Sequence, residues 1–270
     1  MTVPIALTIA GSDSGAGAGI QADLKTFHQF GVYGTTAVVA ITAQNTVGVR
    51  AVHPVPPKIV AAQLAALAED LPPVAVKSGM LATTDLVREV AAAIRRYRWN
   101  NYVLDPVIAA SSGDALLDLE ALTALRAELV PLAELVTPNL DEARLLTRQE
   151  VADPVAMERA GYALLGAGAR AALIKGGHLE GQVVTDVLVT AQGVRRFTHP
   201  RLTTRATHGT GCTLSAAITA GLARGMDLEH SVEQALDFVT RAIAGAPPLG
   251  AGHGPLNHWV PAPRTEESPA

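Results

Sequence analysis

The chain has 270 residues, of which 49% are hydrophobic and only 4% are aromatic, and its formal net charge is −4. A chain of this length suits one α/β domain with a large aliphatic core, in which helices pack closely on a parallel sheet. Because the net charge is negative and no basic block stands out, the composition excludes the electrostatic footprint of a nucleic-acid-binding protein.

The single cysteine, Cys212, cannot form an internal disulfide, which agrees with a reducing compartment. The first ten residues lack the charged start and the cleavage site of a signal peptide, and they read as a buried strand instead. No uninterrupted apolar run is long enough to cross a bilayer. We therefore expect a soluble cytoplasmic protein with no membrane association.

Short apolar runs alternate with amphipathic segments along most of the chain. This alternation predicts a mostly parallel sheet with helices on both faces, an α/β/α sandwich of three layers. The predicted strands are Ile5–Ala10, Thr35–Thr42, Val74–Lys77, Tyr102–Asp105, Leu135–Thr137 and Ala171–Lys175. The predicted helices are Ile20–Phe30, Lys58–Glu69, Asp85–Tyr97, Leu119–Leu129, Leu140–Thr147 and Val155–Leu165.

The pattern changes in the last third of the chain. Val183–Thr190 and Val194–Thr198 predict two strands joined by the turn residues between them, which make an antiparallel hairpin at the edge of the sheet. Two further helices are expected at Cys212–Arg224 and Leu228–Ile243.

No internal repeat and no linker divides the chain, so we interpret residues 1–260 as one domain. The Pro- and Glu-rich tail at 261–270 is expected to be disordered.

The most informative segment is Thr207–Gly221, where apolar residues recur at the spacing of one helical face. Residues 209–212 then form the turn that enters this helix, with free backbone N–H groups that attract phosphate. A short Gly-Thr-Gly is also common as a simple flexible turn. Cys212 can likewise be a small buried hydrophobe, although the helix dipole at this position favours a thiolate and so a functional role.

A second glycine-rich turn, residues 11–19, follows the first predicted strand. It has neither the Gly-Lys-Ser/Thr ending of an ATPase phosphate loop nor the Rossmann spacing, so its glycines are expected to let the backbone approach a flat ligand. In the helix that follows, Asp23 lies on or beside the apolar face. A carboxylate there needs a partner, and an internal one such as Lys77 and a ligand group are equally compatible with the pattern.

Polar residues end several of the predicted strands, where ligands bind to doubly wound sheets. They are Gln44 with Asn45, Lys77, Asp105 and Lys175. We expect them to converge on one edge of the sheet.

Residues 137–142 read as a strand running into a helix, with Pro138 at the first helical position. Asn139 and Glu142 can cap that helix. Alternatively they hold water around Mg²⁺, which takes only one or two carboxylates.

Taken together, these motifs resemble the hydroxymethylpyrimidine/phosphomethylpyrimidine kinases of thiamine biosynthesis. The resemblance runs from about residue 4 to 258 and is highly specific. It rests on Ala10–Phe27, Ala43–Thr46, Lys77–Met80, Leu104–Val107, Thr137–Asn139, Glu142, Lys175–His178, His208–Ser215 and Gly252–Pro255.

The resemblance implies a ribokinase-like fold, and two successive phosphoryl transfers from ATP, first to a pyrimidine alcohol and then to its monophosphate. It also implies Mg²⁺ and a homodimer. The residues expected to bind the pyrimidine are Gly11, Asp23, Gln44, Met80 and Val107. Those expected to serve ATP and Mg²⁺ are Asp105, Thr137, Asn139, Glu142, Lys175 and Thr210, with Asn139 and Glu142 holding the ion through water. Gly209, Gly211 and Cys212 would form the anion hole, with Cys212 at the base position, and Lys175 is expected among the catalytic residues as well.

Two positions depart from related patterns. Ala16 stands where these kinases often have Gly, and Cys212 stands where sugar kinases of the superfamily have Asp, which argues against a sugar kinase. Pyridoxine or pyridoxal kinase and a non-catalytic ring-binding protein of the same fold remain as alternatives. Gln44 resembles the pyrimidine branch, because an amide can both donate to and accept from an aminopyrimidine edge.

Overall fold

A computed structural model describes residues 3–108, 119–177, 179 and 181–263. Its centre is a nine-stranded sheet in the order β3-β2-β1-β4-β5-β6-β7-β8-β9. The six strands from β2 through β1 to β7 are parallel, while β3 at one edge and β8 and β9 at the other are antiparallel. The strands are β1 (Ile5–Ser12), β2 (Tyr33–Asn45), β3 (Gly48–Pro54), β4 (Ala75–Ser78), β5 (Tyr102–Leu104), β6 (Leu135–Val136), β7 (Ala171–Ile174), β8 (Val183–Thr190) and β9 (Gly193–Pro200).

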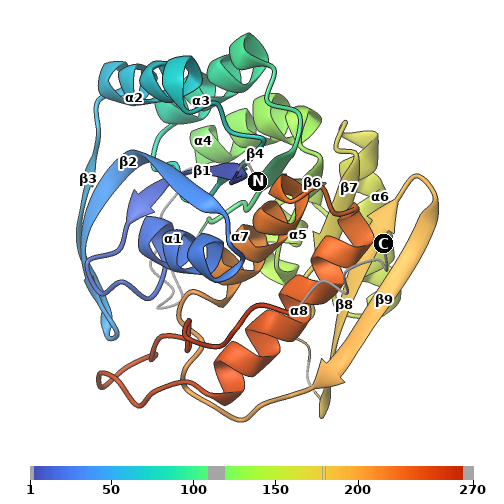
Figure 1. The fold of residues 1–270 in the computed structure, drawn as a ribbon. Helices are drawn as coiled ribbons and strands as arrows, with labels where there is room; N and C mark the ends of the chain where they lie inside the picture. The colour runs from blue at the N-terminus through green and yellow to red at the C-terminus, as the bar shows by residue number, and fades with distance from the viewer. Residues whose placement is uncertain (1–2, 109–118, 178, 180, 264–270) are drawn as a thin grey trace, which may run out of the picture.

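Helices cover both faces of the sheet, which confirms the predicted three-layer α/β/α architecture (Figure 1). One core contains the apolar faces of α2 (Pro57–Asp70), α3 (Thr84–Tyr97), α4 (Leu119–Ala124), α5 (Leu140–Thr147) and α6 (Pro154–Gly166). The other contains those of α1 (Gly19–Gln29), α7 (Thr210–Ala223) and α8 (Leu228–Ala244). The central strands are therefore buried on both faces, which explains their largely apolar sequences.

The first part of the chain departs from the predicted elements. The strand β3 was not predicted, because an exposed edge strand that contains Arg50 and His53 and ends at Pro54 lacks the apolar alternation of a strand with one buried face. Its pairing with β2 extends that strand to Asn45. Gln44 was expected to follow the strand, but it lies within it. Lys77 is a fully buried residue inside β4.

Two helices also differ from the prediction. The helix expected to run to Leu129 changes into a π-helical turn, Leu125–Leu129, after α4. Pro138 lies before the cap of α5 and not at its first position, because Asn139 is the N-cap. Residues 264–270 of the predicted tail lie outside the described residues.

Two irregularities in strand pairing lie beside the carboxyl end of β1. The β1–β2 register shifts between Ala10 and Gly11, and the β2–β3 register shifts between Ala43 and Gln44. Such bulges re-aim side chains and are common at the rims of functional sites. In the described part of the chain, no helix has both the length and the hydropathy that a membrane span requires.

Candidate active site

A cavity of about 680 Å³ lies at the carboxyl ends of β1, β5 and β7, where the first turn of α7 meets the sheet. This is the edge at which polar strand ends were expected to converge. Twelve of the predicted residues line the cavity, whereas among the described residues Asp23 and Thr137 do not. The twelve are Gly11, Gln44, Met80, Asp105, Val107, Asn139, Glu142, Lys175, Gly209, Thr210, Gly211 and Cys212.

The turn entering α7 has the conformation of an anion-binding helix N-terminus. Gly209 is the N-cap with φ 84°, and a Cβ there would lie 1.8 Å from the Gly17 carbonyl oxygen, so only glycine fits. Within the described part of the chain, the backbone N–H groups of Gly211 and Cys212 have no hydrogen-bond partner. These free donors and the helix dipole can bind a phosphate group in the cavity.

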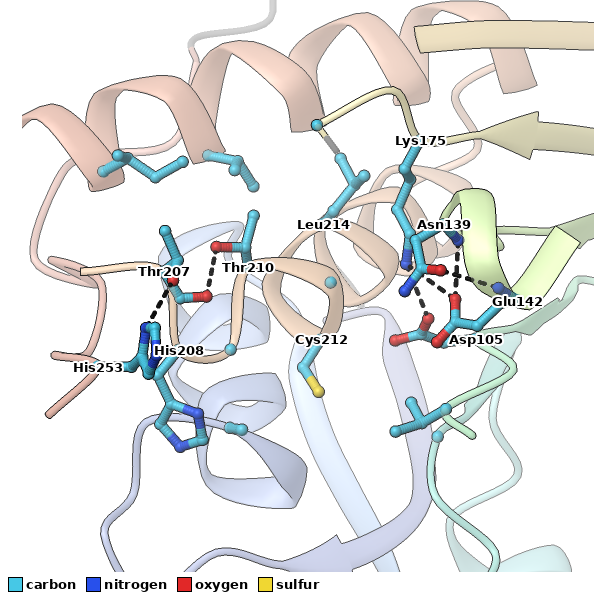
Figure 2. Close-up of a pocket in the computed structure, with 18 of the residues that line it drawn as sticks. Asp105, Asn139, Glu142, Lys175, Thr207, His208, Thr210, Cys212, Leu214 and His253 are labelled. Atoms are coloured by element: carbon cyan, nitrogen blue, oxygen red, sulfur yellow. Dashed lines mark hydrogen bonds and ion pairs between the residues drawn. The ribbon is translucent and has the colours of Figure 1, made fainter. Parts of the chain in front are cut away.

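Lys175 lies among acidic side chains, on the side of the α7 turn that faces away from His208 (Figure 2). Its Nζ lies 3.3 Å from Asp105 Oδ1 and 3.8 Å from Glu142 Oε2. Burial alone would lower the pKa of Lys175, but the two carboxylates outweigh it and the pKa is raised. The ammonium is therefore charged and held where a phosphate on the α7 turn would meet it. Thr137 lies behind Asp105, with its Oγ1 3.4 Å from Oδ1.

Asn139 and Glu142 form a complete capping box at the start of α5. Asn139 Oδ1 accepts from the Glu142 N–H at 2.9 Å, and Glu142 Oε2 accepts from the Asn139 N–H at 2.7 Å. The capping role that the sequence allowed is therefore confirmed. The two residues also line the cavity, so capping orients them toward it and does not exclude a second role.

The acidic side of the cavity carries an excess of negative charge. Asp105 and Glu142 both face Lys175, and burial raises the pKa of Glu142 to about 7 against the opposing charge of Lys175. A buried carboxyl of this kind is stabilised by a further cation. The described residues offer no cluster of three or more metal-binding side chains. Two carboxylates and one amide suit Mg²⁺, which keeps several waters and takes its other ligands from phosphates.

Asp23 has an internal partner, which resolves the two possibilities left by its position on the helix. Its Oδ1 lies 2.7 Å from Lys77 Nζ, and its Oδ2 accepts from Thr8 Oγ1 at 2.6 Å. Both charged side chains are fully buried. Lys77 Nζ also lies 3.4 Å from the Cys212 carbonyl oxygen, so the Asp23–Lys77 pair contacts and stabilises the first turn of α7.

Cys212 is half-buried and points into the cavity between the acidic cluster and His208 (Figure 2). Burial raises the pKa of its thiol to about 11, although Lys77 opposes this effect. Burial is the largest of the influences on this thiol, and it acts against the thiolate that the helix dipole would favour. The thiol is protonated at neutral pH.

The remaining wall carries the residues expected to shape the ring site. Met80 and Val107 give it an apolar surface, and Gln44 adds an amide. A Cβ on Gly11 would lie 2.6 Å from Met80 Cε, so this glycine makes room for the methionine and not directly for a ligand. Ala16 adopts φ 59°, a left-handed conformation that explains why glycine suits this position better.

Several lining residues carried no assignment in the sequence analysis. Asp13 and His208 form a buried hydrogen bond with Nε2 2.8 Å from Oδ2, and Thr42 lines the cavity as well. The acid inside the first glycine-rich turn was the signal available for Asp13. Residues of α7 and α8 form a further, apolar wall of the cavity. In the sequence they cannot be told from ordinary core residues, because they recur at helical spacing. The wall comprises Leu214, Leu236, Val239 and Ile243, together with Thr240.

The fold and the site define an α/β phosphotransferase, with a helix N-terminus and a lysine facing a cavity rimmed by carboxylates. A model of the phosphomethylpyrimidine kinase family matches residues 13–257. The chain belongs to this family.

Individual relatives are similar to this chain over nearly its full length. The hydroxymethylpyrimidine/phosphomethylpyrimidine kinase of Haemophilus influenzae is 47% identical over 259 residues, covering 94% of this chain and 96% of its own. The crystal structure of phosphomethylpyrimidine kinase from Clostridium difficile is 41% identical with a TM-score of 0.80, covering 89% and 99%. An ADP complex of Bacillus subtilis pyridoxal kinase is 38% identical with a TM-score of 0.89, covering 95% and 98%. These neighbours confirm the ribokinase-like fold.

Proposed function

We propose that this protein transfers the γ-phosphoryl group of ATP to 4-amino-5-hydroxymethyl-2-methylpyrimidine, and then a second one to the resulting monophosphate, for thiamine biosynthesis. One observation carries the proposal. A single cavity joins free N–H groups at the start of α7, the cation Lys175 and a ring-sized apolar wall with one amide, Gln44. The names of the relatives supply the substrate.

The two ends of the cavity suit the two substrates. The apolar wall on α7 and α8, with Thr240, suits the base of a nucleotide, while Met80, Val107 and Gln44 suit a small polar ring. The α7 turn lies between them, where a terminal phosphate would meet the hydroxymethyl group. Holding the two groups in line can lower the barrier by roughly 7–11 kcal/mol.

Charge stabilisation by the chain's own groups adds to this effect. The N–H groups of Gly211 and Cys212 and the ammonium of Lys175 surround the position of the transferred group. Each well-placed donor contributes about 3–4 kcal/mol. Asn139 and Glu142, with Asp105 beside them, would hold Mg²⁺ through water, and the ion would neutralise charge on the phosphates.

Cys212 is the residue that faces the substrate hydroxyl. Its thiol must first lose its own proton to solvent, a step that the nearby charge of Lys77 favours. The thiolate then accepts the hydroxyl proton as the alcohol oxygen bonds to the γ-phosphorus and ADP leaves, a contribution of about 10²–10⁴ in rate. The second transfer does not use this base, since a substrate phosphate is already ionised and needs neutralisation by Lys175 and the amides instead.

Pyridoxal kinase is the second candidate function, because the structural neighbours with that name superpose with a TM-score of 0.89. Gln44 favours the pyrimidine, since one amide matches the adjacent donor and acceptor of an aminopyrimidine edge. We place the protein in the cytoplasm as a homodimer, as the family resemblance implies.

A coupled ADP-release assay with Mg²⁺·ATP separates these functions. Hydroxymethylpyrimidine, its monophosphate and pyridoxine are each offered as the acceptor, with Lys175→Met as the inactive control. Turnover of both pyrimidines, and pyridoxine slower by at least tenfold in kcat/KM, is the expected result. Turnover of pyridoxine alone selects the second candidate, and ring binding without ADP release would make the protein a non-catalytic binder.

A further inference from the structure

The terminal amide of Gln44 lies between two groups in the wall of the cavity. The structure has its Nε2 3.4 Å from His208 Nε2 and its Oε1 3.3 Å from Thr42 Oγ1. A half-turn of the amide exchanges its oxygen and its nitrogen without moving any other atom. The protons on the two neighbours therefore decide which orientation is stable.

On the first side, the histidine must carry a proton on Nε2. That nitrogen lies 2.8 Å from Asp13 Oδ2, and the two side chains are both buried. Burial alone would raise the pKa of Asp13, but hydrogen bonds from His208 and from backbone N–H groups lower it, so Asp13 is a carboxylate that only accepts. Nε2–H consequently donates to Asp13, and a second group at 3.4 Å from Nε2 can only be an acceptor.

On the second side, the single proton of a hydroxyl is already committed. Thr42 Oγ1 lies 2.8 Å from the backbone carbonyl oxygen of Ser12, which cannot donate. Thr42 must therefore donate to Ser12, and its oxygen can only accept from a further neighbour. An NH₂ group on this side, the reverse of the Oε1 placement at 3.3 Å, is consequently the favoured orientation of the Gln44 amide.

The hydrogen-bond requirements of His208 and of Thr42 favour the same orientation of the Gln44 amide. We propose that the Asp13–His208 pair, together with Thr42, locks the Gln44 amide with its oxygen toward His208 and its nitrogen toward Thr42, and so makes His208 a positioning residue for ring specificity. This inference rests on the proposed function, since it gives the orientation in which the ring is read.

The backbone beneath the amide is fixed by the same loop. Ser14 Oγ donates to the Gln44 carbonyl oxygen at 2.7 Å and accepts from the Gln44 N–H at 2.8 Å. Three consecutive residues, Ser12, Asp13 and Ser14, thus hold Gln44 through Thr42, through His208 and directly. The irregular β2–β3 register at Ala43–Gln44 lies at the same point. This explains the acid within a glycine-rich loop, because its carboxylate both organises the loop and fixes the histidine.

A locked amide has a defined donor and acceptor pattern. The spare lone pair of the oxygen lies on the His208 side, and the spare N–H lies on the Thr42 side. A 4-aminopyrimidine matches both, with its amino group toward His208 and its ring N3 toward Thr42. The 4-oxo analogue, 5-hydroxymethyl-2-methylpyrimidin-4(3H)-one, presents the reverse pattern on that edge, with N3–H donating and the carbonyl accepting. An amide that could turn freely would accept either ring.

The test compares kcat/KM for the amino and oxo rings in wild type, His208→Ala and His208→Gln. In His208→Ala the Asp13 carboxylate keeps its backbone donors on Gly15, Gly17 and Ala18, while the amide loses the His208 half of its lock and keeps the Thr42 half. In His208→Gln an N–H group can occupy the place of Nε2–H. A role of His208 in the anion turn alone would change both rings equally, so the ratio isolates the lock.

Wild type is expected to prefer the amino ring by roughly 10- to 100-fold, the discrimination typical of one bidentate pair. The preference should fall by at least about threefold in His208→Ala, where Thr42 alone orients the amide, and return toward its wild-type value in His208→Gln. For a variant with no turnover, the ratio of the two dissociation constants from calorimetry replaces the kinetic ratio, and thermal melting confirms folding.

Two results would overturn the inference: a wild type that uses both rings equally, or a His208→Ala variant that keeps the wild-type ratio. Both presuppose turnover of the amino ring by wild type. Failure of that turnover refutes the proposed function, a separate outcome that leads back to the acceptor assay.

Discussion

Lys77 Nζ lies 2.7 Å from Asp23 Oδ1, and neither side chain reaches solvent. Asp23 belongs to α1 and Lys77 to β4, so this ion pair joins a helix to the centre of the sheet directly under Cys212. Removing one partner of such a pair leaves an uncompensated buried charge, which is costlier than removing both.

We therefore expect Asp23→Asn to lower the free energy of unfolding by roughly 3–5 kcal/mol, because Lys77 loses its counter-charge. The double variant Asp23→Asn/Lys77→Met should recover more than half of that loss. Urea unfolding followed by circular dichroism measures both. A single variant that costs less than about 1 kcal/mol would show that the pair contributes little.

The thiol of Cys212 should titrate far above neutrality. Since its pKa is raised to about 11, alkylation by iodoacetamide at this only cysteine should accelerate about tenfold per pH unit from pH 7 to 10 and show no plateau in that range. A plateau below pH 9 would contradict the buried, neutral thiol.

In parallel, Cys212→Ala should lower kcat for the alcohol by about 10²–10⁴, with the ATP dissociation constant nearly unchanged.

Gly211 separates activity from stability. It has no left-handed φ, and a Cβ there would lie 3.1 Å from Lys175 Nζ. Gly211→Ala should keep or raise Tm, because alanine favours a helix by up to about 1 kcal/mol, yet should lower kcat by at least about tenfold as the methyl group displaces the ammonium and fills the anion turn.

Gly221→Ala in the same helix is the matched control for Gly211→Ala. Its Cβ would lie 2.6 Å from Ser231 Oγ in the contact with α8, so Tm should fall while turnover per folded molecule is kept. Equal effects of the two substitutions on both quantities would remove the special role of Gly211.

His258 should make the protein sensitive to acid. Its Nε2 lies 3.0 Å from Thr213 Oγ1, and burial lowers the pKa of the imidazole to about 4. The unfolded chain binds the proton first, so the stabilisation is present above pH 6.5 and is lost as the pH falls toward 4, on the order of 2 kcal/mol in total. His258→Gln should flatten that decline, whereas the exposed His28→Gln should not. Identical pH profiles for wild type and His258→Gln would contradict this assignment.

Sequence reasoning recovered those features that depend on local pattern. Buried parallel strands such as β5 and β7 are continuous apolar runs, and the turn at Gly209 is marked by glycines next to a helical repeat. The edge strand β3 was not predicted, because its exposed residues carry no apolar alternation.

The remaining features depend on partners that are distant along the chain. The pattern placed Asp23 on the inner face of α1 but could not choose between Lys77, 54 positions away, and a ligand. His208 and Asp13 are 195 positions apart, so no spacing connects them. The pKa of Cys212 depends on how far it is buried, whereas the sequence revealed only the helix dipole, which acts in the opposite direction.

The proposed mechanism requires the terminal phosphate of ATP to lie at the start of α7. A crystal structure with a non-hydrolysable ATP analogue and hydroxymethylpyrimidine tests it directly. It should place the γ-phosphate within hydrogen-bonding distance of the N–H groups of Gly211 and Cys212, and the ring against Gln44 with its hydroxymethyl group facing Cys212. A terminal phosphate bound away from the start of α7, or a ring outside the Met80–Val107 wall, would contradict the kinase mechanism.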